Sequence, residues 1–268
     1  MPRPRPASSV STAQVPPAPI AKTTVQNPAP SAPNSLSDPA TPQPERAKRP
    51  AHERTYFDLR DMILFGDLLP GQPVTIQGLT NLLNTGMTPV REAIRRLTSE
   101  GALILHGNRR ISVPILSEPD IKDIVFIRKS IETELVRRAT VSITPAQINI
   151  LQGIDTALDA AISTGNIRAY LRHNYEFHIT LNAIANAPVL AEVVNRLWLR
   201  FGPSLRVVCG RLGTQNLPDW HKDILSGLRA RDPDLVADAT TSDLEQGMVQ
   251  VLAELNLPSQ HGQSPAHR

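Results

Sequence analysis

Three arginines stand close together in the segment NTGMTPVREAIRRLTSEGALI, residues 84–104. On a helix over about 87–100, Arg91 and Arg95 lie four residues apart on the outward face, with Arg96 to one side. An arginine side chain can make paired hydrogen bonds to guanine in the major groove or bind backbone phosphates. This spacing predicts a helix that contacts duplex DNA. The alternative is an ordinary solvated helix face with Arg–Glu pairs.

The elements around this helix favour the DNA-binding interpretation. Helices are expected over about 54–66 and 76–83, the second with its leucines facing inward. A tight turn follows, and Thr88 is expected to cap the third helix, with Pro89 at its first position. A helix that follows another helix and a tight turn, and that presents outward arginines, can enter a major groove.

Two short strands are expected after the third helix, around a polar tip from His106 to Arg110. This hairpin could reach the neighbouring backbone or minor groove as a wing. The candidate DNA-contacting residues are Thr88, Arg91, Arg95, Arg96, Arg109 and Arg110.

A second group of residues could hold a ligand in the C-terminal half. The stretch HNYEFHITL, residues 173–181, places Asn174 and His178 four apart on one helix face. His221 falls in the first turn of a later helix, and Asp243 falls in the last long helix. Side chains from three helices could converge inside a bundle, where metal and ligand sites are commonly built. By spacing alone, a hydrogen-bonded core or surface histidine remains the simpler alternative.

The pattern from 117 to about 256 is helical throughout. Ser117 is a good N-cap and acidic residues follow it in the first turn. The fold class is therefore mainly α: a winged helix-turn-helix with a small β-hairpin, followed by an all-α bundle. Further helices are expected over about 144–164, 166–185, 188–209, 217–230 and 233–255.

Composition divides the chain into four segments. Residues 1–50 contain 13 of the 25 prolines and are expected to be disordered, because they cannot bury enough apolar surface to offset their ordering entropy. Residues 51–116 form the winged helix-turn-helix domain, 117–256 the all-α domain, and 257–268 a second disordered tail.

The net charge of +3 is distributed unevenly. Residues 1–50 hold six Lys/Arg and two Asp/Glu, about +4, whereas 51–116 carry about +1 and 117–268 about −2. Overall basicity is thus a weak argument for nucleic-acid binding, and the positions of particular arginines must carry it.

Membrane and secretory signals are missing from this sequence. No apolar run approaches the roughly 18–20 residues that a membrane span needs, and the N-terminus has no apolar core of the signal-peptide kind. The single Cys209 cannot form an internal disulfide. We therefore expect a cytoplasmic protein with no membrane partner.

The string LLPGQ…LTNLLNTGMTPVREAIRRLTSEGALI…RRISV resembles the winged-helix head of GntR-type bacterial transcription regulators. The all-α remainder resembles the effector (FCD) domain of the fatty-acid-regulator subfamily, so the resemblance covers about 54–255. It implies a ligand-responsive regulator, not an enzyme, that binds a two-fold symmetric operator as a homodimer. Two departures, Gly86-Met87 in place of the family's Ser-Arg and the altered wing at 108–110, predict a changed operator preference.

The same resemblance implies a metal site. Many members of the subfamily bind a divalent metal through Asp-x-x-x-His on one helix and one histidine on each of two later helices. The four residues of this chain that match these ligands still carry one negative charge and offer both nitrogen and oxygen ligands, which suits zinc, nickel, iron or manganese. A metal-free pocket held by hydrogen bonds is the alternative. The matching positions here are Asn174, His178, His221 and Asp243, of which the first and last differ from the family.

The resemblance also implies a small organic-acid effector. Arg128, in RKSIE, matches an arginine of the family's first effector-domain helix and is expected to pair with a carboxylate. Arg206 and Trp220 are weaker candidates, for which a surface salt bridge or simple packing is the competing interpretation.

Two other functions remain open at this point. A metal-assisted hydrolase or lyase could use His178, His221 and Asp243, but no Ser/His/Asp set, phosphate loop or paired-carboxylate motif accompanies them. A constitutive DNA-binding protein, whose helical domain only dimerises, is the other alternative.

Overall fold

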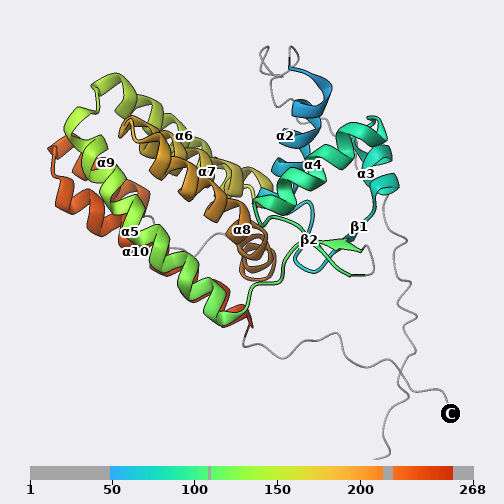
Figure 1. The fold of residues 1–268 in the computed structure, drawn as a ribbon. Helices are drawn as coiled ribbons and strands as arrows, with labels where there is room; N and C mark the ends of the chain where they lie inside the picture. Colours follow the sequence, from blue (N-terminus) through green and yellow to red (C-terminus); the bar gives the residue numbers. More distant parts are fainter. Residues whose placement is uncertain (1–48, 108–109, 214–219, 256–268) are drawn as a thin grey trace, which may run out of the picture. The chain divides into compact units, whose positions relative to one another are not determined.

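The computed structural model describes residues 49–107, 110–213 and 220–255 (Figure 1). The predicted tails 1–50 and 257–268 lie almost wholly outside these residues, as does Arg109. No helix of the described residues has the length and apolar character that a membrane crossing requires. The helices are α2 (Ala51–Leu64), α3 (Ile76–Leu82), α4 (Met87–Ser99), α5 (Glu118–Ser142), α6 (Pro145–Ser163), α7 (Ile167–Ile184), α8 (Pro188–Leu212), α9 (Trp220–Ala230) and α10 (Pro233–Leu255).

A small three-stranded antiparallel sheet accompanies the first three helices. Its strands, β1 (Pro73–Val74), β2 (Ile104–Leu105) and β3 (Ile111–Ser112), lie in the order β1-β3-β2. The sequence predicts β2 and β3 as the two strands after the third helix but predicts no strand between residues 66 and 76, so β1 is an addition. Proline is tolerated here because β1 is an edge strand.

The amphipathic pattern of α4 predicts its buried face. Val90, Ala93, Ile94 and Leu97 are buried, as their helical spacing indicates. The prediction that Thr88 caps this helix is wrong. The helix begins at Met87, with Gly86 as N-cap, two residues before the Pro89 start that a Thr88 cap requires, so Thr88 lies inside the first turn and no side chain caps the helix. In α3 only Leu79 is buried, whereas Leu82 is 52% exposed.

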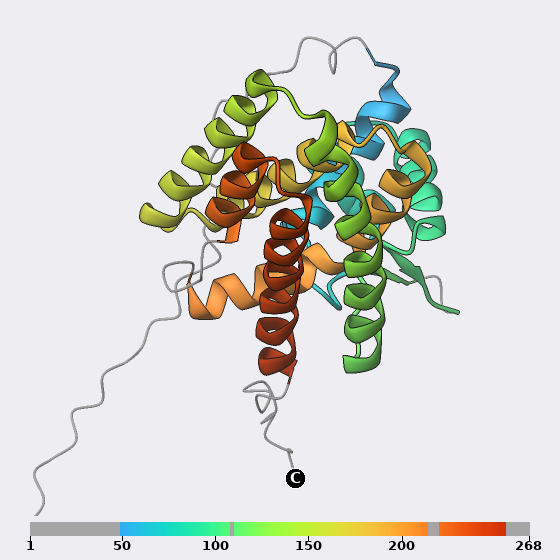
Figure 2. The same cartoon turned by 90° about the vertical axis from the view of Figure 1, so that its left-hand side faces the viewer.

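The helical domain begins at a capping box. The Ser117 hydroxyl accepts a hydrogen bond from the Asp120 N–H, and the Asp120 carboxylate accepts one from the Ser117 N–H, so α5 starts where the sequence predicts. Helices α5 and α10 lie side by side over most of their length (Figure 1 and Figure 2). One buried apolar cluster runs from α2 and α4 into α8, and a second surrounds Phe177 within the bundle.

Close backbone contacts join α2 to α8. A Cβ on Gly202 would lie 2.5 Å from the Leu64 carbonyl oxygen, and a Cβ on Gly66 would lie 2.1 Å from the Arg206 Cγ. Gly66 also has a positive φ of 72°, which glycine adopts without strain. The winged-helix segment is therefore packed tightly against one helix of the bundle.

Candidate functional site

The outward side of α4 carries the predicted DNA-reading arginines. Arg91 is exposed and makes no ion pair or hydrogen bond with any described residue. The Arg95 Nη2 atom lies 2.5 Å from Glu92 Oε2, and this side chain is 80% exposed. Exposed pairs of this kind contribute little stability and exchange readily for another anion. Arg91 and Arg95 can therefore reach an approaching duplex.

Arg96 differs from its two neighbours. Its Nε donates to Glu100 Oε1 at 3.0 Å, and its guanidinium lies 3.7 Å from the ring centroid of Tyr56. This arginine therefore connects α4 to α2. Thr88 and Arg110 are exposed, and the Arg110 carbonyl accepts the His106 N–H at 2.8 Å across the β2–β3 tip.

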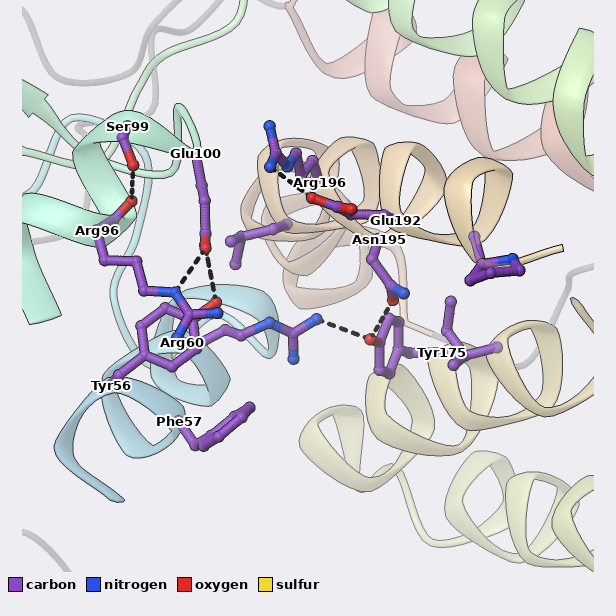
Figure 3. A pocket seen from close by; sticks show the side chains of 14 residues that line it. Tyr56, Phe57, Arg60, Arg96, Ser99, Glu100, Tyr175, Glu192, Asn195 and Arg196 are labelled. Atoms are coloured by element: carbon purple, nitrogen blue, oxygen red, sulfur yellow. Dashed lines mark hydrogen bonds and ion pairs between the residues drawn. The ribbon is translucent and has the colours of Figure 1, made fainter. Parts of the chain in front are cut away.

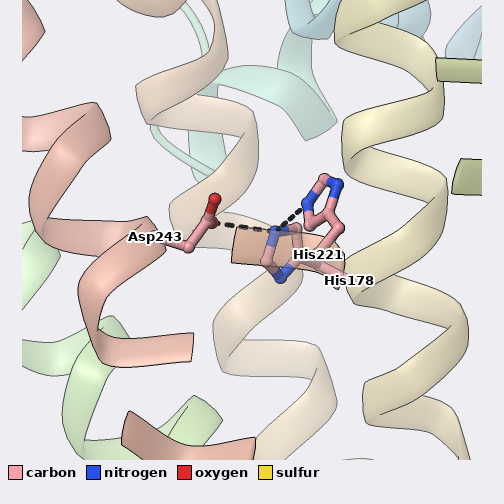
Figure 4. Close-up of side chains that lie close together, drawn as sticks. All are labelled: His178, His221 and Asp243. Atoms are coloured by element: carbon pink, nitrogen blue, oxygen red, sulfur yellow. Dashed lines mark hydrogen bonds and ion pairs between the residues drawn. The ribbon is translucent and has the colours of Figure 1, made fainter. Parts of the chain in front are cut away.

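Three side chains from three helices converge inside the bundle (Figure 4). His178 Nε2, from α7, lies 3.0 Å from Asp243 Oδ2 on α10 and 3.3 Å from His221 Nε2 on α9. One donor atom from each residue falls within 4.8 Å of the others. Asn174, one turn before His178, is buried and lines the adjacent cavity with Asp243. The structure thus brings together the residues that the sequence predicts as ligands.

Each histidine presents its other ring nitrogen to a buried carboxylate. His178 Nδ1 lies 4.0 Å from Glu132 Oε2, and His221 Nδ1 lies 3.8 Å from Asp155 Oδ1. Carboxylates behind the histidines fix the ring orientation in many metal sites. Here His178 Nε2 faces Asp243 and His221 Nε2 faces His178 Nε2, while both Nδ1 atoms face the buried carboxylates.

The two buried carboxylates, Glu132 and Asp155, were not among the residues predicted from the sequence. Glu132 accepts from Arg128 Nε at 2.6 Å and from Asn182 Nδ2 at 3.2 Å. Asp155 is bound by Lys222. The spacing of Arg128 and Glu132, four apart on one helix, is a signal that could have paired these two. For Asp155 the sequence offers only Gln152, three residues earlier, which donates to Asp155 Oδ2 at 3.3 Å, while its charged partners come from α9.

The donor set fits a small divalent cation. A ring nitrogen carries either a proton or a lone pair, so without a cation His178 Nε2 must share one proton between Asp243 and His221. Two nitrogen ligands at about 2.0–2.1 Å from a tetrahedral zinc lie roughly 3.3 Å apart. The separations of His178 Nε2 from His221 Nε2 and from Asp243 Oδ2, 3.3 and 3.0 Å, are close to this spacing, and all three donor atoms lie within 4.8 Å of one another.

The charge of Asp243 suits the same role. Burial raises the pKa of its carboxyl, but the charge and hydrogen bond of His178, together with His221 and Arg128, outweigh burial and hold this pKa below its ordinary value. Asp243 is therefore anionic at neutral pH, as a metal-binding carboxylate must be.

Arg128 places a buried guanidinium beside this cluster. Its side chain is 2% exposed and its guanidinium lies 3.9 Å from the ring centroid of Trp198. The Arg128 Nη2 and Trp198 Nε1 atoms are buried without a hydrogen-bond partner among the described residues. Arg128 and Asp243 line one cavity of about 30 Å³, roughly the volume of one water.

The two weaker effector candidates lie elsewhere. The stem of Arg206 packs against Gly66 and does not line this cavity, which favours the packing interpretation. Trp220 Nε1 donates to Gln246 Oε1 at 2.8 Å, and Gln246 lines the cavity. Trp220 is therefore one contact away from it.

A winged helix-turn-helix with an exposed arginine helix, joined to a helical bundle with a buried polar site, defines a transcription regulator with a separate effector domain. The family model "Bacterial regulatory proteins, gntR family" matches residues 51–113, and the FCD domain model matches residues 123–246. The chain belongs to the GntR family and carries an FCD domain.

Known relatives agree with this assignment. The chain is 26% identical over 203 residues to the HTH-type transcriptional regulator McbR of Escherichia coli K12, covering 74% of this chain and 91% of McbR. It is 26% identical over 199 residues to the transcriptional repressor RspR of the same strain, covering 74% and 87%.

A solved structure, that of E. coli McbR/YncC, matches with a TM-score of 0.72 and 25% identity, covering 76% of this chain and 98% of that one. The family and these relatives are transcription regulators rather than enzymes, and nothing found supports the hydrolase alternative.

Proposed function

We propose that this GntR-type regulator binds a two-fold symmetric operator as a homodimer and responds to a small carboxylate effector in its FCD domain. Residues 51–116 bind DNA, and residues 117–256 bind the effector and dimerise. The protein acts in the cytoplasm. The observation that carries the proposal is the buried Arg128 Nη2, unpartnered among the described residues, next to the His/Asp cluster.

The DNA side of the proposal rests on α4. Its buried face fixes the helix against α2, and Arg91 and Arg95 project from the opposite side. A two-fold operator presents two half-sites, which two copies of the chain read symmetrically. Thr88, Arg109 and Arg110 are secondary candidates for backbone contacts.

The metal side rests on donor chemistry. His178, His221 and Asp243 hold a zinc, nickel, iron or manganese ion, with Asn174 as an additional oxygen donor. The bound metal supplies a positive charge that attracts a carboxylate. Arg128 binds the same carboxylate from the other side of the cavity, through the Nη2 atom that has no partner among the described residues.

The cavity size links binding to a change of shape. A volume of about 30 Å³ admits an ion or a water but not an organic acid. The effector therefore selects an arrangement in which the helices around Arg128 have moved apart. A ligand that binds two arrangements unequally shifts operator affinity, typically by about 5–150-fold.

A thermal-shift screen tests the effector assignment. Metal-stripped protein is reloaded with Zn²⁺, assayed for metal content, and screened against organic and sugar acids. An effector present at 100 times its dissociation constant should stabilise the fold by about 2.7 kcal/mol. The Arg128→Lys variant should lose this response. If Zn²⁺ binds but no acid stabilises the wild-type protein, the constitutive DNA-binding alternative is favoured.

The carboxylate behind His221 gives a prediction about the metal. Asp155→Asn should weaken Zn²⁺ binding by about 10–100-fold, because the amide no longer fixes the imidazole with a negative charge. Competition with a chromophoric chelator measures this. Asp159→Asn is the matched control, since Asp159 also contacts Lys222, at 2.8 Å, but is exposed. Equal Zn²⁺ affinity of Asp155→Asn and Asp159→Asn would contradict the role of Asp155.

A further inference from the structure

One tyrosine hydroxyl connects the helical bundle to the winged-helix segment (Figure 3). Tyr175 Oη, on α7, accepts a hydrogen bond from Arg60 Nη2 on α2 at 2.7 Å and donates one to Asn195 Oδ1 on α8 at 2.8 Å. Both hydrogen-bonding roles of the hydroxyl are filled. The Arg60 side chain is 14% exposed, so its bond to Tyr175 is shielded from solvent. Hydrogen bonds to charged groups are among the stronger ones in proteins.

Tyr175 is also attached to the proposed ligand site. It lies between Asn174 and His178 on the same helix, so a movement of α7 that repositions these residues also moves Tyr175. Its ring makes an edge contact with Trp198, with centroids 5.6 Å apart. Trp198 in turn lies under the Arg128 guanidinium.

Arg60 is connected to α4, the helix with the predicted DNA-contacting arginines, through α2. Tyr56, one turn before Arg60 on α2, donates its hydroxyl to Glu100 at 2.8 Å. Burial, followed by the hydrogen bond to Glu100, raises the pKa of Tyr56 to about 12, so this hydroxyl remains a donor at neutral pH. Glu100 is the C-cap residue of α4 and also binds Arg96. A displacement of α2 at Arg60 is thereby transmitted to the end of α4.

The Arg60–Tyr175 contact borders an open groove. Residues of α2, α4, α7 and α8 line a cavity of about 750 Å³ that includes both side chains (Figure 3). The junction of α2 with α8 beside this groove is packed more closely. Gly202 and Gly66 let the two segments approach there, and Arg168 binds Asp67 through two nitrogens. The packed junction can act as a pivot, while the contact across the groove can open or close.

We infer that Arg60 and Tyr175 are positioning residues that couple occupancy of the His178/His221/Asp243 site to the placement of α4 on DNA. This inference rests on the proposed function, because it needs a ligand in the helical domain and a duplex on α4. It adds to that function the Arg60–Tyr175 contact. Without this contact the protein still binds metal and duplex, but metal binding no longer changes the affinity for duplex.

A double-mutant cycle with Zn²⁺ as the probe tests the inference. Metal-free and Zn²⁺-saturated full-length protein are titrated against a duplex that the metal-free wild type has selected from a random-sequence pool. Fluorescence anisotropy gives the duplex dissociation constants, and chelator competition gives Zn²⁺ affinity. The set contains the wild type, Tyr175→Phe, Arg60→Met, their double variant, Arg60→Lys as the conservative rescue, and Arg168→Gln as the matched interdomain control.

Zn²⁺ should change the wild-type duplex affinity by at least about fivefold. Tyr175→Phe, Arg60→Met and the double variant should all reduce this change to below about twofold, with Zn²⁺ affinity and metal-free duplex affinity near the wild-type values. The double variant should add nothing to either single one. Arg60→Lys, which keeps a charged donor, should retain part of the change, and Arg168→Gln nearly all of it.

Persistence of the full wild-type change in Tyr175→Phe and Arg60→Met would overturn the inference alone. Loss of the change in Arg168→Gln to the same extent would also overturn it, because any weakened junction would then have the same effect. A wild-type protein that binds no Zn²⁺ or no duplex would contradict the proposed function, and the inference with it.

Discussion

Arg128→Met should lower the free energy of unfolding by about 3–5 kcal/mol. The substitution leaves Glu132, whose side chain is 0% exposed, without the guanidinium that binds it at 2.6 Å. Asn182 still donates to Glu132, but a neutral amide does not compensate a buried charge. Urea unfolding of metal-free protein, followed by circular dichroism, measures the change.

Two variants distinguish this explanation from a general loss of packing. Adding Glu132→Gln to Arg128→Met should recover a large part of the loss, because removing both charges removes the unpaired one. Lys122→Met is the matched control: Lys122 pairs with Glu118 on the same helix at the same spacing, but both side chains are exposed. We expect an effect within about 0.5 kcal/mol for this control. An Arg128→Met loss as small as that of Lys122→Met would contradict the buried-pair argument.

Arg91→Ala and Arg95→Ala should each weaken operator binding by about 1–3 kcal/mol, or roughly 5–150-fold. Both side chains project from the exposed side of α4, and among the described residues the only ion pair of either is that of Arg95 with Glu92, which is exposed. If an arginine contacts a base edge, preference at one base pair is also lost. If it contacts phosphate, binding weakens uniformly and the salt dependence becomes shallower.

Binding to selected duplexes at several salt concentrations separates these two outcomes. Arg138→Ala is a suitable control, because Arg138 is a similarly exposed arginine paired with Glu134 on α5, away from α4. Arg96→Ala should differ from both neighbours by also lowering stability, since Arg96 binds Glu100 and covers the Tyr56 ring. Unchanged affinity and unchanged base preference in the Arg91→Ala/Arg95→Ala double variant would show that α4 does not read the operator.

Local signals predicted the helices well. The i, i+4, i+7 spacing of Val90, Ile94 and Leu97 reports which side of a helix is buried, whatever that side packs against. The capping box at Ser117 likewise requires only residues three apart. Strand β1 could not be predicted in this way, because two residues become a strand only when β3 is present beside them.

The sequence predicted the His/Asp cluster of the candidate site but not the carboxylate behind His221. His178, His221 and Asp243 were identified because the family resemblance supplied their alignment, and the structure places them within 4.8 Å of one another. Asp155 was missed, because its contacts with His221 and Lys222 join residues more than 60 positions apart. The same holds for the bond between Arg60 and Tyr175, which are separated by 115 positions.

The sequence by itself determined the helical periodicity, the Ser117 cap, the exposed arginines of α4 and the GntR and FCD class of the chain, because these depend on neighbouring residues or on recognisable motifs. Only the tertiary structure decided which buried charges meet, that Arg128 keeps an unpartnered donor among the described residues, and that Arg60 reaches Tyr175. Such contacts depend on how α2, α5, α7 and α8 pack, and packing selects distant partners that no local pattern records.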